Sequence, residues 1–210
     1  MTMSPYNRDQ LEAITMIRRY MGEPSRGRMS QIKRKIQSYL RFRADVADFQ
    51  KRDFSVLCTQ KCFTSQTSAC CGREGIATFF ADMVINIFLS SAEEIDSLSQ
   101  TLIHDLGGLN CVYLTDKGCL WRLKPIVCEM FLCQHAKDTV LGGDETIQSQ
   151  WEKLCRREKR YTWPSRPVLF DDLEKLFIKK GFDSPLMYFH RSPGLLRVKA
   201  QSKIKKTVTF

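Results

Sequence analysis

The chain of 210 residues contains nine cysteines, and eight of them fall between Cys58 and Cys133. Cysteine thiolates are the ligands that tetrahedral zinc and iron–sulfur clusters prefer. A free cysteine also packs well as a small apolar side chain, but packing does not explain two adjacent cysteines in a loop rich in Ser and Thr. We therefore expect one or two metal centres on these eight residues: Cys58, Cys62, Cys70, Cys71, Cys111, Cys119, Cys128 and Cys133. The ninth, Cys155, has an apolar helix position and is expected to pack.

The cysteine spacing is C-x3-C-x7-CC-x39-C-x7-C-x8-C-x4-C. Zinc fingers and ribbons usually use CxxC pairs, which are missing, and the runs of ferredoxins are missing too. The spacing therefore favours an iron–sulfur cluster, with zinc as the alternative. In an extended segment Cys70 and Cys71 point to opposite faces, so we expect them to serve two centres, or one to bind while the other packs or reacts. Cys133 joins the site of Cys128 only if the helix between them ends or bends.

The start of the chain lacks the uninterrupted apolar stretch and the cleavage site of a secretory signal. No segment offers the ~18 consecutive apolar residues of a membrane span, and the longest apolar stretch, from Ile76 to Leu89, is broken by Asp82 and Asn86. We therefore expect a cytoplasmic protein without a membrane partner. In that reducing compartment clustered cysteines serve as ligands or redox groups more often than as disulfides.

Charge is distributed unevenly along the chain, whose formal net charge is +10. Lys and Arg outnumber Asp and Glu in residues 1–56 and 151–210, whereas residues 57–150 are acidic. A centre held by four thiolates adds a formal charge of about −2 to that middle segment. The basic flanks could fold back over it, or present solvated helix faces, or bind a nucleic acid or an acidic protein. We favour the first two alternatives over nucleic-acid binding.

Helix periodicity predicts an N-terminal pair of helices in residues 1–56, interpreted as a basic helical hairpin. Asn7 caps the first, which ends at Gly22, and the second runs from about Ser30 to Phe49, with Arg43 among the cations on its polar sides. We expect residues 57–140 to form the metal-binding core, in which the stretch from Cys58 to Gly75 is a loop that metal coordination fixes.

Three further signals lie in the second half of the core and beyond it. Ser91 and Glu94 form a capping-box pattern that opens a helix. Two short apolar runs around Asp116-Lys117-Gly118 predict a β-hairpin carrying Cys111 and Cys119, and Pro125 suits the first turn of the helix that carries Cys128. Residues 141–196 are expected to be helices packed on the core, one capped by Asp144 and another from about Asp171 to Gly181. Residues 197–210 form a basic tail.

The expected fold class is thus α+β and mainly helical, with a cysteine-rich centre, a short β-hairpin, and helices on both flanks. Three carboxylates near the cysteines in sequence could replace a thiolate or act in acid–base chemistry: Glu74, Asp82 and Glu129. Walker A, G-x-G-x-x-G, HExxH and G-x-S-x-G motifs are absent, so the common nucleotide-binding and hydrolase signatures are missing.

Residues 58–133 resemble a family. The run from Cys111 to Cys119 and the run from Lys124 to Cys133 are similar to the second half of the signature of the zinc- or iron-chelating cysteine-cluster proteins, the YkgJ-like family. The first half of that signature, a CxxC followed by a CC pair, resembles Cys58, Cys62, Cys70 and Cys71, although this chain has C-x3-C and a longer gap. The intervening Phe88-Leu-Ser-Ser-Ala-Glu-Glu-Ile95 is similar to the family's apolar run and acidic helix start.

The resemblance implies a bacterial metal-chelating module, and a related cysteine cluster occurs in flagellin lysine methylases. We therefore carry three hypotheses. The first is a cytosolic iron–sulfur protein with a redox, structural or substrate-binding centre. The second is a zinc-stabilised adaptor whose basic arms bind nucleic acid or an acidic protein, and the third is a protein-modifying enzyme related to the methylases. The sequence does not decide whether the protein is an enzyme.

Overall fold

The computed structural model describes residues 3–22, 26–68, 70–72, 78–105, 108–163 and 167–188. Glu74 and the basic tail of residues 197–210 lie outside these ranges. The elements in chain order are α1 (Pro5–Gly22), α2 (Arg26–Asp53), η1 (Ser55–Phe63), α3 (Phe80–Leu89), α4 (Ala92–Ile103), β1 (Leu114–Thr115), β2 (Gly118–Cys119), α5 (Ile126–Glu129), α6 (Gln134–Ala136), η3 (Lys137–Leu141), α7 (Glu145–Thr162) and α8 (Leu169–Ile178). The expectation of a mainly helical chain with one short antiparallel hairpin is confirmed.

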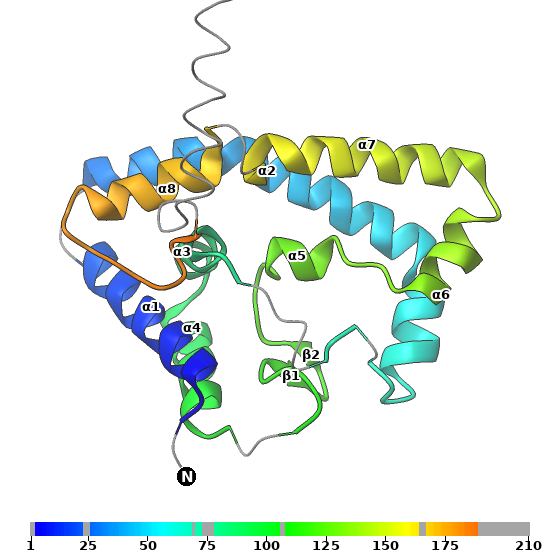
Figure 1. Cartoon of the computed structure of the whole chain (residues 1–210), viewed down its shortest axis with the longest axis horizontal. Coiled ribbons are helices and arrows are strands. Elements are labelled where there is room, and N and C mark those ends of the chain that lie inside the picture. Colours follow the sequence, from blue (N-terminus) through cyan, green and yellow to red (C-terminus); the bar gives the residue numbers. More distant parts are fainter. Residues whose placement is uncertain are drawn as a thin grey trace, which may run out of the picture.

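The helices form an upper layer and a lower part joined through α3 (Figure 1). In the upper layer α2 packs against α7 and α8, and below it α1 packs against α3 and α4. The segments that carry most of the cysteines lie on the other side of the lower part, around α5 and the β1–β2 hairpin (Figure 1). The division into domains along the chain stays a prediction.

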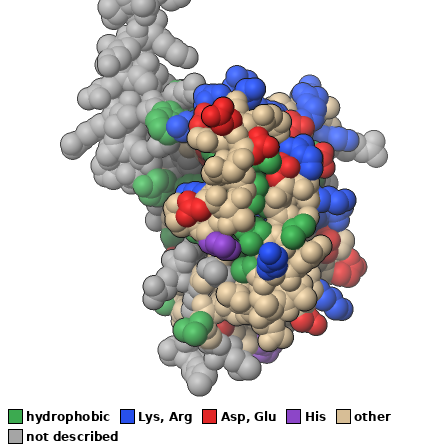
Figure 2. Space-filling model, turned by 90° about the vertical axis from the view of Figure 1, so that its right-hand side faces the viewer, with side chains coloured by type: hydrophobic (Ala, Val, Ile, Leu, Met, Phe, Trp, Pro, Cys, Tyr) green, Lys and Arg blue, Asp and Glu red, His purple; other side chains and the backbone are tan. Residues whose placement is uncertain are grey.

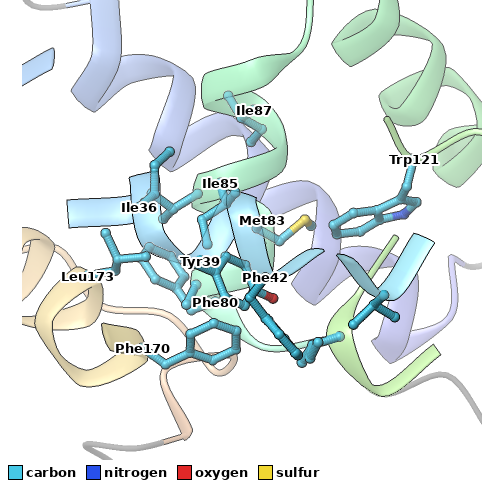
Figure 3. Close-up of a cluster of buried hydrophobic side chains, with 14 of the residues drawn as sticks. Ile36, Tyr39, Phe42, Phe80, Met83, Ile85, Ile87, Trp121, Phe170 and Leu173 are labelled. Atoms are coloured by element: carbon cyan, nitrogen blue, oxygen red, sulfur yellow. The ribbon is translucent and has the colours of Figure 1, made fainter. Parts of the chain in front are cut away.

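The core is built around α3, whose residues from Phe80 to Ile87 are all buried. Figure 3 shows Tyr39 and Phe42 of α2 meeting Phe80 of α3 and Phe170 of α8. The rings of Tyr39 and Phe170 lie 5.7 Å apart at 73°, an edge-to-face arrangement that adds about 0.5–1.5 kcal/mol to the burial of the rings. Packing of apolar and aromatic side chains therefore fixes the helices that carry the rest of the molecule.

Most of the expected helix caps are confirmed. Ser91 caps α4, with Glu94 closing the capping box, and Asp144 caps α7 by accepting from Thr146 and Ile147 N–H. Asn7 was expected to cap α1, but Ser4 does so by accepting the Asn7 N–H at 3.1 Å. The side chain of Asn7 is buried instead, because α1 packs on α4. There it donates to the Leu102 carbonyl.

A further expectation is wrong for the start of the cysteine segment. Ser55–Phe63 is a π-helix rather than a loop. The chain leaves α2 at Asp53 and continues as η1 with only Phe54 between them, so the preceding long helix supports it. Stretches of π-helix are rare and are often found at functional sites.

No helix within the described residues is both long and apolar enough to cross a lipid bilayer.

Candidate metal centre

The cysteines of the predicted site are all free thiols, and none of the eight is fully buried. Cys58 and Cys62 lie on η1, four residues apart, which places them on nearly the same face of a helix. The C-x3-C spacing therefore suits a helical ligand pair, where the usual CxxC suits a turn. The spacing of Cys58 and Cys62 is the sequence signal for this helix, although the composition of the stretch from Cys58 to Gly75 predicts a loop.

Cys70 and Cys71 do not lie in the extended segment that the sequence analysis considered. They lie at a turn in which Cys71 N–H donates to the Ser68 carbonyl at 2.8 Å. In this turn the Cys70 thiol donates to the Cys71 sulfur, which lowers the pKa of Cys71 and raises that of Cys70. The alternation of side chains that an extended segment would give does not apply, because the backbone bends here.

Cys111 and Cys119 lie at the base of the hairpin. Leu114 pairs with Cys119 in the ladder, and Cys111 N–H donates to the Cys71 carbonyl at 2.7 Å. That hydrogen bond, with the bridge between Gly72 and Asn110, joins the CC turn to the hairpin although 40 positions separate them in sequence. The predicted hairpin is confirmed, and Cys111 lies just before its first strand.

Cys128 lies on the short helix α5, for which Pro125 is the N-cap residue. α5 ends at Glu129, so the chain turns before Cys133. Cys133 is the N-cap residue of α6, and its sulfur accepts the Ala136 N–H at 3.4 Å. The helix thus ends before Cys133, as joining the site of Cys128 would require, but the pKa of Cys128 responds to Cys111 and Cys119, whereas charge on Cys133 acts on the pKa of Cys58.

The thiols whose charges act on one another's pKa fall into two groups that overlap at Cys70. Burial is the main cause that raises the pKa of Cys58, and charge on three other cysteines raises it further: Cys70, Cys133 and Cys62. Such effects need charges to lie near one another. We call these four the first group.

The second group consists of Cys71, Cys111, Cys119 and Cys128. Charge on the other three counteracts the lowering of the Cys71 pKa by Cys70. Burial raises the pKa of Cys128 to about 12, and charge on Cys111 and Cys119 adds to this. Cys70 also acts on Cys128, so the adjacent Cys70 and Cys71 are the point at which the two groups meet.

Backbone N–H groups lie near several of these sulfurs. Those of Tyr113 and Leu114 lower the pKa of Cys111, and that of Trp121 lowers the pKa of Cys119, while burial raises both. The Leu114 N–H itself donates to the Cys111 carbonyl at 3.0 Å. Donors aimed at sulfur stabilise thiolates and are one means by which proteins tune metal–sulfur centres.

In the part of the chain that the structure describes, no three side chains of Cys, His, Asp or Glu converge as ligands on one point. The donor chemistry nonetheless fits a thiolate-bound metal, because charge on one thiol acts on the pKa of others from distant segments and the Cys133 sulfur accepts an N–H. Burial raises the pKa of Cys58, Cys111, Cys119 and Cys128, so the metal-free state favours neutral thiols, and a bound cation would favour the thiolates.

The segment that carries Cys128 is held by polar side chains of the helical core. Asn86 of α3 accepts the Leu123 N–H at 3.0 Å, and Asp82, one turn earlier, accepts the Ile126 N–H at 3.1 Å. These two residues are the polar interruptions of the longest apolar stretch. They are buried because they bind backbone groups, and Asp82 also accepts the Phe79 N–H.

Arg43 of α2 was expected on a polar helix face, but it is 3% exposed. Its guanidinium donates to the Tyr39 hydroxyl at 2.8 Å and to the Lys124 carbonyl at 2.6 Å, and lies 3.8 Å from the Glu129 carboxylate. Gln50 adds a hydrogen bond to the Glu129 carbonyl. The sequence does not reveal these roles. Arg43 lies two positions after Arg41 and therefore looks like part of a solvated basic face, and Gln50 carries no local signal.

Neither of the two described carboxylates that we considered as ligands is available in this arrangement. Asp82 faces backbone amides, and burial raises its pKa to about 7 against the lowering effect of Arg43. Glu129 is 9% exposed and faces Arg43 and Lys124. Both position the Cys128 segment. Cys155 of α7 is half-buried and packs against the apolar core, as expected.

A cleft of about 690 Å³ opens between two segments that carry cysteines, although no cysteine is among its lining residues. Its lining comes from the segment that links Cys62 to Cys70 and from the hairpin region around Cys111: Phe63, Thr64, Gln66, Ser68, Asn110, Leu114, Thr115 and Asp116. Gln66 and Ser68 have φ of 60° and 39°, a conformation that non-glycine residues rarely adopt and that is enriched at functional sites.

Comparisons of the chain with protein-family models, with curated proteins and with solved structures gave no match. The resemblance of residues 58–133 to the cysteine-cluster family therefore stays an expectation.

Proposed function

We propose that this protein binds metal through two four-cysteine groups and that the bound species is an iron–sulfur cluster, with zinc as the alternative. The observation that carries the proposal is the division of eight free thiols, from distant stretches, into two groups that meet at Cys70 and Cys71. Cys58, Cys62, Cys70 and Cys133 would hold one centre, and Cys71, Cys111, Cys119 and Cys128 the other. Four sulfur ligands are the usual complement of one zinc or one cluster.

Metal binding would require the side chains in each group to turn towards one another. The second group is better prepared for this, because hydrogen bonds already tie Cys111 to Cys71 and the segment before Cys128 to α3. Desolvation and the repulsion between neighbouring thiolates raise the pKa of Cys128. A bound cation would offset both effects. An iron–sulfur cluster would supply electron transfer or a substrate-binding iron, while the chain's own residues orient the sulfurs and limit access of water.

Purification without oxygen, followed by iron, sulfide and zinc analysis and a visible spectrum, tests the proposal. We expect a brown protein with broad absorbance near 400 nm and with iron and sulfide in similar amounts. A colourless protein with stoichiometric zinc would show that the bound metal is zinc and not an iron–sulfur cluster. A chain that binds neither metal when it is refolded with each of them contradicts the proposal altogether.

The cleft supports a substrate-binding role over a purely structural one. Its lining includes Phe63 and Asn110, the sequence neighbours of Cys62 and Cys111, so a molecule in it would contact the segments that carry these two cysteines. A spectral change of the iron-loaded protein on addition of a candidate cosubstrate would support this role and the hypothesis of a protein-modifying enzyme. A spectrum that no candidate changes would favour a redox or structural centre.

A further inference from the structure

Two basic helix segments lie in the upper layer, away from the two cysteine groups. Residues 26–44 of α2 contain no Asp or Glu, and residues 153–163 contain one acid, Glu158. Glu158 is half-buried and accepts a hydrogen bond from Thr162. Acids just outside these ranges pair with three of the cations: Glu152 with Arg156, Asp45 with Arg157 and Asp172 with Lys35. The remaining cations of the two segments have no acid within their own segment except Glu158.

The two helices run antiparallel, which brings parts of these segments together. The Tyr161 hydroxyl donates to the Ser38 carbonyl at 3.1 Å, and further along the pair Arg157 lies 2.6 Å from Asp45. Phe49 stacks on Trp151 with 5.8 Å between the ring centroids. The end of α7 therefore lies beside the middle of α2, near Ser38, and the first turns of α2 run on beyond it towards α8, where Lys35 pairs with Asp172 at 3.0 Å.

Six exposed cations form what we call the basic ridge: Lys33, Arg34, Arg41, Arg156, Lys159 and Arg160. Arg34 and Arg41 are seven residues apart, which places them on one face of α2 about 10 Å from each other. Figure 2, which looks onto the end of the molecule where α7 begins, shows Lys and Arg side chains at the top and along one flank, interspersed with Asp and Glu. Among the α2 cations whose side chains the structure describes, Arg43 is the buried one.

The ridge lacks the features of a protein-binding surface. Protein interfaces depend on apolar and aromatic anchors and are depleted in Lys. Among the described residues of α2 and α7, and those directly after them, the one exposed large apolar side chain is Trp163, and Lys159 covers its ring at 4.8 Å. A single covered ring is also too little for a single-stranded nucleic acid, which needs aromatic platforms for its bases.

We propose that the basic ridge binds the phosphate backbone of a nucleic-acid duplex. Two adjacent rows of long cationic side chains can each follow phosphates without reading bases, as in sequence-independent binding. The inference goes beyond the proposed metal function and does not depend on it, because the ridge is built on α2 and α7 alone. If both proposals hold, the metal centres would be carried by a protein bound to a nucleic acid.

Fluorescence anisotropy with the full chain and a labelled 20-base-pair DNA of mixed sequence tests the proposal. If four to six phosphates are neutralised, affinity should fall roughly 10²- to 10³-fold between 50 and 200 mM salt. The paired variant Arg34→Glu with Arg160→Glu should weaken binding at least tenfold at 50 mM salt. The milder pair Arg34→Gln with Arg160→Gln should weaken it less.

The matched control is Arg8→Glu with Lys117→Glu, which changes the same charge at exposed positions outside the ridge. All variants keep the basic C-terminal residues, and circular dichroism and metal content verify that they fold alike. Equal weakening by the ridge pair and the control pair would overturn the proposal, as would absence of binding at 50 mM salt. Single-stranded DNA of the same length, or polyglutamate of the same charge, binding as tightly as the duplex would also overturn it.

Discussion

The two cysteine groups differ in what holds them. In the first group the hydrogen bonds of the segment that carries Cys58 and Cys62 are local, such as those from Thr67 and Ser68 N–H to the Cys62 carbonyl. In the second group, long-range bonds tie Leu123 and Ile126 to α3 and join Cys111 to Cys71. The second group is thus placed by the helical core, whereas the segment of Cys58 and Cys62 is held by local hydrogen bonds and by its continuation from α2.

This difference has a thermodynamic meaning. A site that the fold positions in advance binds its metal without a large cost of ordering the chain, whereas a site on a locally bonded segment must order that segment as it binds. We therefore expect the first group to lose metal at lower chelator concentration than the second. The predictions that follow test this comparison, beginning with the largest effect.

Replacing ligands of one group should remove one centre and leave the other. The variant Cys111→Ser with Cys119→Ser should lose about half of the bound metal, and Cys58→Ser with Cys62→Ser should lose the other half, because four thiolates make up each centre. Metal analysis of purified protein measures this, and Cys155→Ser should bind as much as the unaltered chain. If either pair removed all of the metal, the eight thiols would form one coupled centre.

Arg43→Met should destabilise the fold by about 3–5 kcal/mol. The substitution leaves the buried Glu129 carboxylate without its closest described cation and the Lys124 carbonyl without its donor. Urea unfolding at constant metal content measures the loss. The matched control, Arg41→Met, lies two residues earlier on an exposed face and should change stability by less than about 0.5 kcal/mol. Similar effects of both variants would show that the buried arginine does not hold the second group.

Asp82 should make stability fall as the pH rises. Its pKa is raised from 3.8 to about 7, with burial as the main cause, so between these values the folded state holds a proton that the unfolded state has lost. Stability from this group is therefore complete below pH 4 and declines up to about pH 7, with roughly 2–3 kcal/mol lost between pH 5 and 8. Asp82→Asn keeps an acceptor for Ile126 N–H and should lack this component. Unfolding curves of both proteins at several pH values measure the difference, and parallel profiles would contradict it.

The smallest expected effect concerns Cys71. In the metal-free protein the Cys70 thiol lowers the Cys71 pKa, so Cys71 should be alkylated faster than Cys128 near pH 8. Cys70→Ala removes the donor and should shift the alkylation profile of Cys71 to higher pH. Mass spectrometry of iodoacetamide-treated protein follows each site. An unchanged profile would mean that the turn does not bring the two sulfurs together in solution.

Local signals in the sequence determined a good part of the fold. The capping patterns at Ser91 and Asp144 and the Asp-Lys-Gly turn of the hairpin depend on neighbouring residues, so they are visible without a structure. The clustering of cysteines also predicted where the candidate site lies. Asp82 and Asn86 were visible as interruptions of an apolar stretch, although the sequence did not show what they bind.

Tertiary structure alone decided the rest. The neighbouring residues of a cation in α2 do not show whether it lies in solvent or in the core. Arg43 is buried because the Lys124 carbonyl and Glu129 lie opposite it. The division of the thiols and the joining of the two basic helix segments likewise depend on segments far apart in the chain. Sequence patterns report the preferences of neighbouring residues, whereas contacts between distant residues arise only when the packed core brings their segments together.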